Sequence, residues 1–129
     1  MKALKEAIAM GYSEKFLANE LFPQNKYPVP AFRRILKGEG EINLNQAQRL
    51  ASLLDVKVDD LTSGKMWKAE FRKPGLTLMK GAYRVEIKEG NMVKFYHLES
   101  NYYTETKMDE NITLSSFIEI VNQMIENHE

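Results

Sequence analysis

Cationic side chains and small polar side chains at helix starts are the residues of this 129-residue chain most suited to chemistry. Arg33 and Arg34 stand side by side in a stretch with helical spacing, and an arginine fork fits guanine edges and phosphates. Ser13 and Asn43 stand where helices are expected to begin, and the amides of a helix N-terminus favour anions. These residue types favour contact with phosphate groups. The structural alternative is a solvated helix face for the arginines and ordinary capping for Ser13 and Asn43.

Patterns for catalysis and metal binding are weak. The chain has no cysteine, which leaves no thiolate ligand, thiol nucleophile or disulfide. Its two histidines, His97 and His128, are well separated, so we expect neither a two-histidine metal site nor a histidine-based catalytic pair. No serine lies in a nucleophile-elbow setting, and no glycine-rich phosphate loop is present. We therefore expect no enzyme activity, no cofactor and no metal.

The helix that carries the arginines can be read from its start and stop signals. Pro28 and Pro30 suit a helix entry, because the first turn does not use the N–H that proline lacks. Residues 31–37 follow with helical spacing, and Gly38 ends the helix. Other helical segments are expected at residues 2–10, 13–21, 43–54 and 58–61. Together they predict a compact five-helix unit.

Three short patterns recur in this first half. Ile35 stands three residues before Gly38, and residues 13–18 (SEKFLA) place a serine ahead of a Leu-Ala pair. A spaced pattern follows at Leu50, Ala51, Leu54, Val56, Val58, Asp59 and Leu61. Taken together, these residues resemble the lambda-repressor/Cro-like helix-turn-helix family, often called the Xre family. The resemblance covers about half of the chain.

This resemblance implies a repressor-like, sequence-specific transcriptional regulator that binds double-stranded DNA through residues 31–37. The expected DNA-binding residues are Ser13, Gln24, Asn25, Lys26, Pro30, Ala31, Arg33, Arg34, Lys37 and Asn43.

Two features depart from the family pattern. Glu14 stands where the family usually has a glutamine that reaches a DNA phosphate, which would repel a carboxylate. Residues 22–27 (FPQNKY) lengthen the turn before the recognition helix. That turn would either add DNA contacts through Gln24, Asn25 and Lys26 or tilt the helix away from the usual docking. The alternative function is therefore a protein-interaction module or antitoxin-like protein that retains the helix-turn-helix fold.

The overall charge is uninformative, because 18 basic residues balance 18 acidic ones. A DNA-binding role then requires a local basic face. No run approaches the ~20 apolar residues needed to span a bilayer, and the N-terminus does not read as a signal peptide. We expect a cytoplasmic protein that binds no membrane.

The second half changes to the period of a strand. Residues 83–88, 92–98 and 102–108 read as strands, and Gly90-Asn91 is a hairpin signal. Residues 76–80 would be a further strand, and a last helix follows Thr113. The expected fold is α+β. An N-terminal five-helix helix-turn-helix domain, residues 1–63, precedes a small antiparallel β-meander with one C-terminal helix, residues 64–129.

Assembly is expected to use this second half. Trp67 and Phe71 predict an ordered segment, and Met92, Tyr96 and Leu98 leave a second strand face apolar. Because DNA half-sites are usually read by two-fold dimers, we expect a homodimer through the C-terminal half. The alternative is that these side chains pack against the protein's own helices and leave a monomer.

Overall fold

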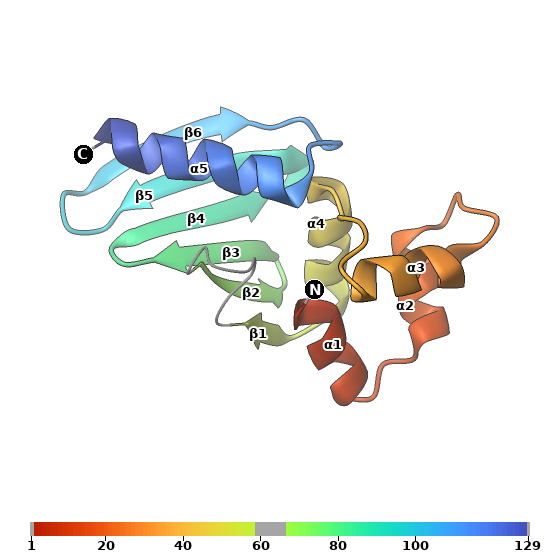
Figure 1. The fold of residues 1–129 in the computed structure, drawn as a ribbon. Coiled ribbons are helices and arrows are strands. Elements are labelled where there is room, and N and C mark those ends of the chain that lie inside the picture. The colour runs from red at the N-terminus through yellow and green to blue at the C-terminus, as the bar shows by residue number, and fades with distance from the viewer. Residues whose placement is uncertain (1, 59–66, 129) are drawn as a thin grey trace.

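The computed structural model describes residues 2–58 and 67–128. Within them, four helices come first: α1 (Lys2–Ala9), α2 (Glu14–Leu21), α3 (Pro28–Leu36) and α4 (Leu44–Leu53). Six strands follow: β1 (Val56–Val58), β2 (Lys68–Arg72), β3 (Gly75–Lys80), β4 (Tyr83–Lys88), β5 (Met92–His97) and β6 (Tyr102–Lys107). A 3-10 turn, η1 (Glu89–Asn91), joins β4 to β5, and helix α5 (Leu114–His128) comes last (Figure 1).

The strands form one antiparallel sheet whose order, β1 to β6, follows the order of the chain. The turn between β4 and β5 has φ values of 75° at Gly90 and 58° at Asn91. Glycine and asparagine are the residues that most readily adopt positive φ. The hairpin predicted at these residues is confirmed, but three residues, 89–91, join the paired Lys88 and Met92, one more than the two-residue turn that the sequence predicted.

The predicted fold class is wrong in how it divides the elements. The sequence predicts five N-terminal helices and a small meander, whereas four helices precede a six-stranded sheet in the described part of the chain. Val56–Val58, assigned above to the helical unit, form β1 and pair with β2. Their alternation of β-branched and charged side chains favours an extended chain, and Val56 is buried opposite Phe71. Residues 59–61 of the expected fifth helix lie outside the described residues.

The segment leading into β2 is part of the core. Trp67 and Phe71 are fully buried, and Nε1 of Trp67 donates to Oδ1 of Asn122 in α5 at 3.0 Å. Their burial inside the chain leaves them unavailable to a subunit interface. The predicted boundary after residue 63 also lies outside the described residues, and β1 and β2 pair across it. The division into two domains stays a prediction.

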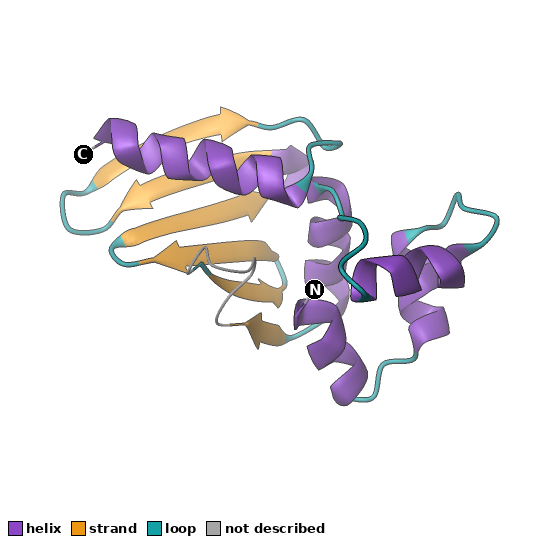
Figure 2. Ribbon diagram, viewed as in Figure 1, coloured by secondary structure: helices purple, strands orange, loops and turns teal. Residues whose placement is uncertain are grey.

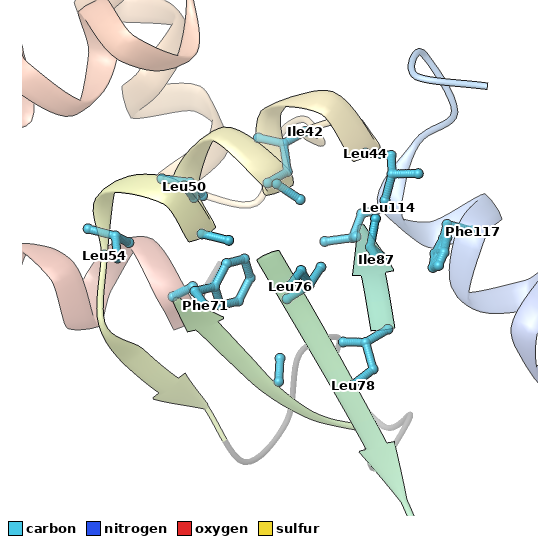
Figure 3. Packing of buried hydrophobic residues seen from close by; sticks show 14 of the residues in the cluster. Ile42, Leu44, Leu50, Leu54, Phe71, Leu76, Leu78, Ile87, Leu114 and Phe117 are labelled. Carbon is cyan, nitrogen blue, oxygen red and sulfur yellow. The ribbon is translucent and has the colours of Figure 1, made fainter. Parts of the chain in front are cut away.

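The sheet has a buried inner face and an open outer face. Alternate strand residues such as Phe71, Leu78 and Val85 are fully buried, while their neighbours along each strand are at least partly exposed. Figure 3 shows Leu50 of α4 near Phe71, with Phe117 of α5 on the same side of the strands. Helices α4 and α5 therefore cover the inner face (Figure 2).

Gln48 joins α4 to the sheet at the point where two strands separate. Its Nε2 donates to the carbonyl oxygens of Ile87 at 3.1 Å and Lys88 at 3.3 Å. Its Oε1 accepts a hydrogen bond from the amide of Leu76 at 2.8 Å. The regular β3–β4 pairing stops at Thr77, so the side chain of Gln48 replaces bonds that the ladder would otherwise make.

A second junction ties the start of α4 to the start of α5. The amide of Leu44 donates to the carbonyl oxygen of Ile112 at 2.8 Å, and that of Leu114 donates to the carbonyl oxygen of Ile42 at 3.0 Å. These backbone bonds hold the two helices that cover the sheet in one fixed arrangement.

Replacing Gln48 with alanine should lower the free energy of unfolding by roughly 3 kcal/mol, because unpaired polar groups in the interior cost about 1–3 kcal/mol each. The amide of Leu76 and the carbonyl of Ile87 would lose their partner. Denaturant unfolding followed by circular dichroism measures the change. Gln123→Ala, on an exposed position of α5, is the matched control and should change stability by less than about 0.5 kcal/mol. Similar small losses in both variants would contradict the role of Gln48.

Candidate nucleic-acid interface

Helices α2 and α3 lie at the end of the molecule away from the sheet (Figure 1). They pack together around buried side chains that include Leu17, Leu21, Phe32 and Ile35. Nε2 of Gln46 in α4 donates to the carbonyl oxygen of Leu21 at 3.0 Å, which fixes this helix pair against α4. The opposite side of α3 faces solvent.

Helix α3 carries most of the predicted recognition residues outward. Pro28 and Pro30 lie in its first turn, as predicted, and Pro30 is exposed. Arg33 and Arg34 lie in its last turn, where cations interact favourably with the helix C-terminus, and both are exposed. Lys37, the exposed C-cap, follows them. Among the described residues, Arg34 and Lys37 have no ion partner, so their charges face solvent.

Glu14 lies on the same surface. Its Oε2 is 3.4 Å from Nη2 of Arg33, and the side chains of Glu14 and Arg33 are 39% and 60% exposed. A solvent-exposed pair of this kind is worth about 0–1 kcal/mol, so it does not lock the arginine in place. The pair does establish that the start of α2 and the outer side of α3 form one surface. The carboxylate of Glu14, which departs from the family pattern, is therefore part of the candidate interface.

The long turn between α2 and α3 is held by Asn25. Its Oδ1 accepts a hydrogen bond from the amide of Tyr27 at 2.8 Å, and its amide donates to the carbonyl oxygen of Phe22 at 3.1 Å. Gln24, Asn25 and Lys26 are all exposed, as contact with a ligand would require. The side chain of Asn25, however, already has a structural role in the turn.

The two predicted helix caps have different surroundings. Oγ of Ser13 accepts a hydrogen bond from the amide of Phe16 at 3.0 Å, at the exposed start of α2. Asn43 and Gln46 bond each other reciprocally, at 2.8 and 2.9 Å, in a capping box. The next amide, that of Leu44, is bonded to the chain that leads into α5. The start of α4 is thus occupied by the protein itself, and we leave Asn43 out of the candidate interface.

Tyr27 is a surface residue that the sequence reading missed. It is the N-cap of α3 and is 64% exposed, and Nζ of Lys26 lies 5.8 Å from the centre of its ring. The sequence could have indicated this residue, because an aromatic side chain directly before Pro28 stands at the start of a helix, outside its buried face.

The histidines, expected to be well separated, lie together. The ring centroids of His97 and His128 are 4.8 Å apart, and Oγ of Ser100 is 2.6 Å from Nδ1 of His97 and 3.4 Å from Nε2 of His128. Separation along the chain misled the prediction, because the last turn of α5 lies against the end of β5. Among the residues that the structure describes, no group of three or more histidine, cysteine, aspartate or glutamate side chains could hold a metal ion.

Comparison of the chain with protein-family models, with curated proteins and with solved structures finds no match. Among the helices that the structure describes, none has the length and apolar character needed to cross a membrane.

Substitution should separate structural residues from surface residues in this region. Asn43→Ala should lower the free energy of unfolding by about 1 kcal/mol through loss of the capping box. Arg34→Ala should lower it by less than about 0.5 kcal/mol, since its side chain faces solvent. Denaturant unfolding of both variants measures the difference. An equally large loss in Arg34→Ala would mean that this arginine serves the fold.

Proposed function

We propose that this protein is a sequence-specific, DNA-binding transcriptional regulator of the Xre helix-turn-helix type, acting in the cytoplasm. The observation that carries the proposal is the outward placement of Arg34 and Lys37 on α3, without an ion partner in the described chain, at an end that the sheet leaves uncovered. Double-stranded DNA carries one negative charge per about 1.7 Å of its axis, so cations placed this way would neutralise phosphates.

Helix α3 would enter the major groove, as the recognition helix of a helix-turn-helix does. Arg33 and Arg34 would supply donors to guanine edges or phosphates. Pro30 and the half-buried Ala31 offer only apolar contact, such as with thymine methyl groups. Lys26 and Tyr27, at the entry of the helix, would reach the DNA backbone.

A second copy would read the other half-site. We propose that the C-terminal half supplies the dimer contact, restricted to side chains that are exposed. The strand β6 ends the sheet order and exposes Tyr102, and Leu98 beside it is 50% exposed. An edge strand offers unpaired backbone groups to a second chain.

A protein-interaction module or antitoxin-like protein with the same fold is the second candidate. The ion pair of Glu14 with Arg33 favours this candidate. The carboxylate partly neutralises the charge of Arg33 and would repel a phosphate. Met10 and Phe16, near the start of α2, are 57% and 42% exposed and would supply apolar contacts.

The affinity of the full chain for labelled duplex fragments should fall steeply between about 50 and 200 mM salt. The logarithm of the binding constant should fall by about 0.9 per log unit of salt concentration for each phosphate contacted. Arg34→Ala should weaken binding and reduce that slope by about one contact. Lys5→Ala, at an exposed position of α1, is the control and should leave duplex binding unchanged. Absent or salt-independent binding would contradict the proposal, and an equal effect of both variants would place the duplex elsewhere.

Glu14→Gln should strengthen duplex binding by roughly eightfold at 0.1 M salt, the value of one added phosphate contact. The substitution removes a negative charge and releases Arg33. The same titration measures it, with Glu39→Gln as a control for the loss of one surface carboxylate. If the protein is a protein-interaction module, Glu14→Gln should not strengthen duplex binding. The substitution should then weaken binding of the partner protein.

A further inference from the structure

The outer face of the sheet has a positive net charge, although the chain as a whole has a net charge of zero. We define the outer face as the strand residues that point away from α4 and α5. Its cations are Lys57, Lys68, Arg72, Arg84, Lys88, Lys94 and Lys107. Its carboxylates are Glu70, Glu86 and Glu105. Seven cations and three carboxylates give the face a net charge of +4, on a protein whose net charge is zero.

Two of the three carboxylates are already neutralised by neighbours on the face. Glu70 pairs with Arg72 at 2.8 Å, and Glu86 pairs with Arg84 at 2.8 Å and Lys88 at 3.5 Å. Partial burial raises the pKa of Glu86, but the charges of Lys88 and Arg84 outweigh it and hold the pKa below its usual value. The side chain therefore stays ionised and paired. The remaining lysines keep their charges available to a ligand.

Two tyrosines, Tyr96 and Tyr103, lie next to each other on this face, in paired strands. The hydroxyl of Tyr96 donates to Oε1 of Glu86 at 3.4 Å, and that of Tyr103 donates to Oε2 of Glu105 at 2.7 Å. Both acceptors lie on the same face of the sheet as the tyrosines, and the two ring planes are tilted by 40° to each other. The ring centroids are 5.0 Å apart, and Tyr103 is 45% exposed. Its bond to Glu105 raises the pKa of Tyr103 to about 12, so the phenol stays neutral at physiological pH.

The tyrosines belong to a row that contains no carboxylate. Across five strands, the pairing aligns Lys68, Met79, Arg84, Tyr96 and Tyr103. At about 4.8 Å between strands, the row is about 19 Å long. It therefore presents Lys68 at one end, Arg84 in the middle and two aromatic rings at the other end.

A cavity of about 120 Å³ opens beside this row, at the end of the face where β2 turns into β3. Cations from two strands and the β2–β3 turn line it: Arg72, Lys73, Arg84 and Lys88. Glu70 and Glu86, which pair with some of these cations, line it as well. The cavity is a second place on this face where positive charge is concentrated.

We propose that the outer sheet face binds single-stranded nucleic acid. Bases would stack on Tyr96 and Tyr103, and the phosphates would lie along the lysines and arginines, since aromatic platforms within a basic groove are the usual means of holding single strands. Duplex DNA keeps its bases stacked on each other and offers none to the tyrosines. A second copy of the chain is disfavoured as the occupant, because two faces of charge +4 repel.

The site is separate from α3, so the two binding activities can be tested independently. Binding of the full chain to a labelled 15-nucleotide oligothymidylate is measured by fluorescence anisotropy at two salt concentrations. Tyr103→Leu should weaken it by about tenfold, the loss expected for one stacked base. Lys94→Gln should weaken it and lower the salt slope by about 0.7, the value of one single-strand phosphate contact. Arg34→Ala on α3 should leave it unchanged.

Three results would overturn the proposal. The first is no binding of the oligonucleotide at low salt by a wild-type protein that melts normally. The second is binding that Arg34→Ala removes while Tyr103→Leu does not, which would assign the strand to α3. The third is equal competition by polyglutamate together with no effect of Tyr103→Leu, which would make the face a docking site for acidic protein. Thermal melting of each variant confirms that it is folded.

Discussion

The side-chain amide of Gln48 is the contact on which the arrangement of the two halves depends. A helix can cover a sheet with apolar side chains alone, but such contacts are not directional. Gln48 adds three directed bonds to backbone groups of β3 and β4. Gly75 permits this approach, because a Cβ there would lie 2.3 Å from the carbonyl oxygen of Ile87. One residue of α4 thus fixes where the sheet sits.

The same helix also fixes α2. Gln46 bonds the last carbonyl of α2, and Arg49 forms an ion pair with Glu20. Helix α4 therefore contacts both α2 and the sheet. It uses Gln46 and Arg49 for α2 and Gln48 for the sheet. As a result, the outer side of α3 and the outer sheet face keep a fixed relation to each other. A chain with no net charge can in this way hold two separate basic surfaces.

The sequence predicted the elements better than it predicted how they combine. Helix boundaries followed from local signals: prolines at the entry of α3 and a capping asparagine before α4. The hairpin at Gly90 and Asn91 followed from the φ values that these residues tolerate. Strand β1 was missed because three residues carry little periodicity, and the family resemblance suggested a helical turn there.

The candidate site shows the same limit. Exposure of the arginines on α3 followed from helical spacing, since Phe32 and Ile35 had to face the core. The occupied start of α4 was not predictable, because its partners are backbone groups of residues 110–112. The pairing of Glu14 with Arg33, the meeting of the two histidines and the charge of the outer face also arise between distant segments. Net charge and local pattern contain no information about such contacts.

The order of the strands has a consequence for synthesis of the chain. Each strand of the sheet pairs with its neighbour in sequence, so the loops closed during sheet formation are short and their entropic cost is small. The bridge between Asn43 and Thr113, in contrast, closes a long loop. A nascent chain emerging from the ribosome can thus pair its strands in turn while the inner face over β4 to β6 stays uncovered. That face is shielded from other chains only after α5, which follows the six strands in the chain, has left the exit tunnel.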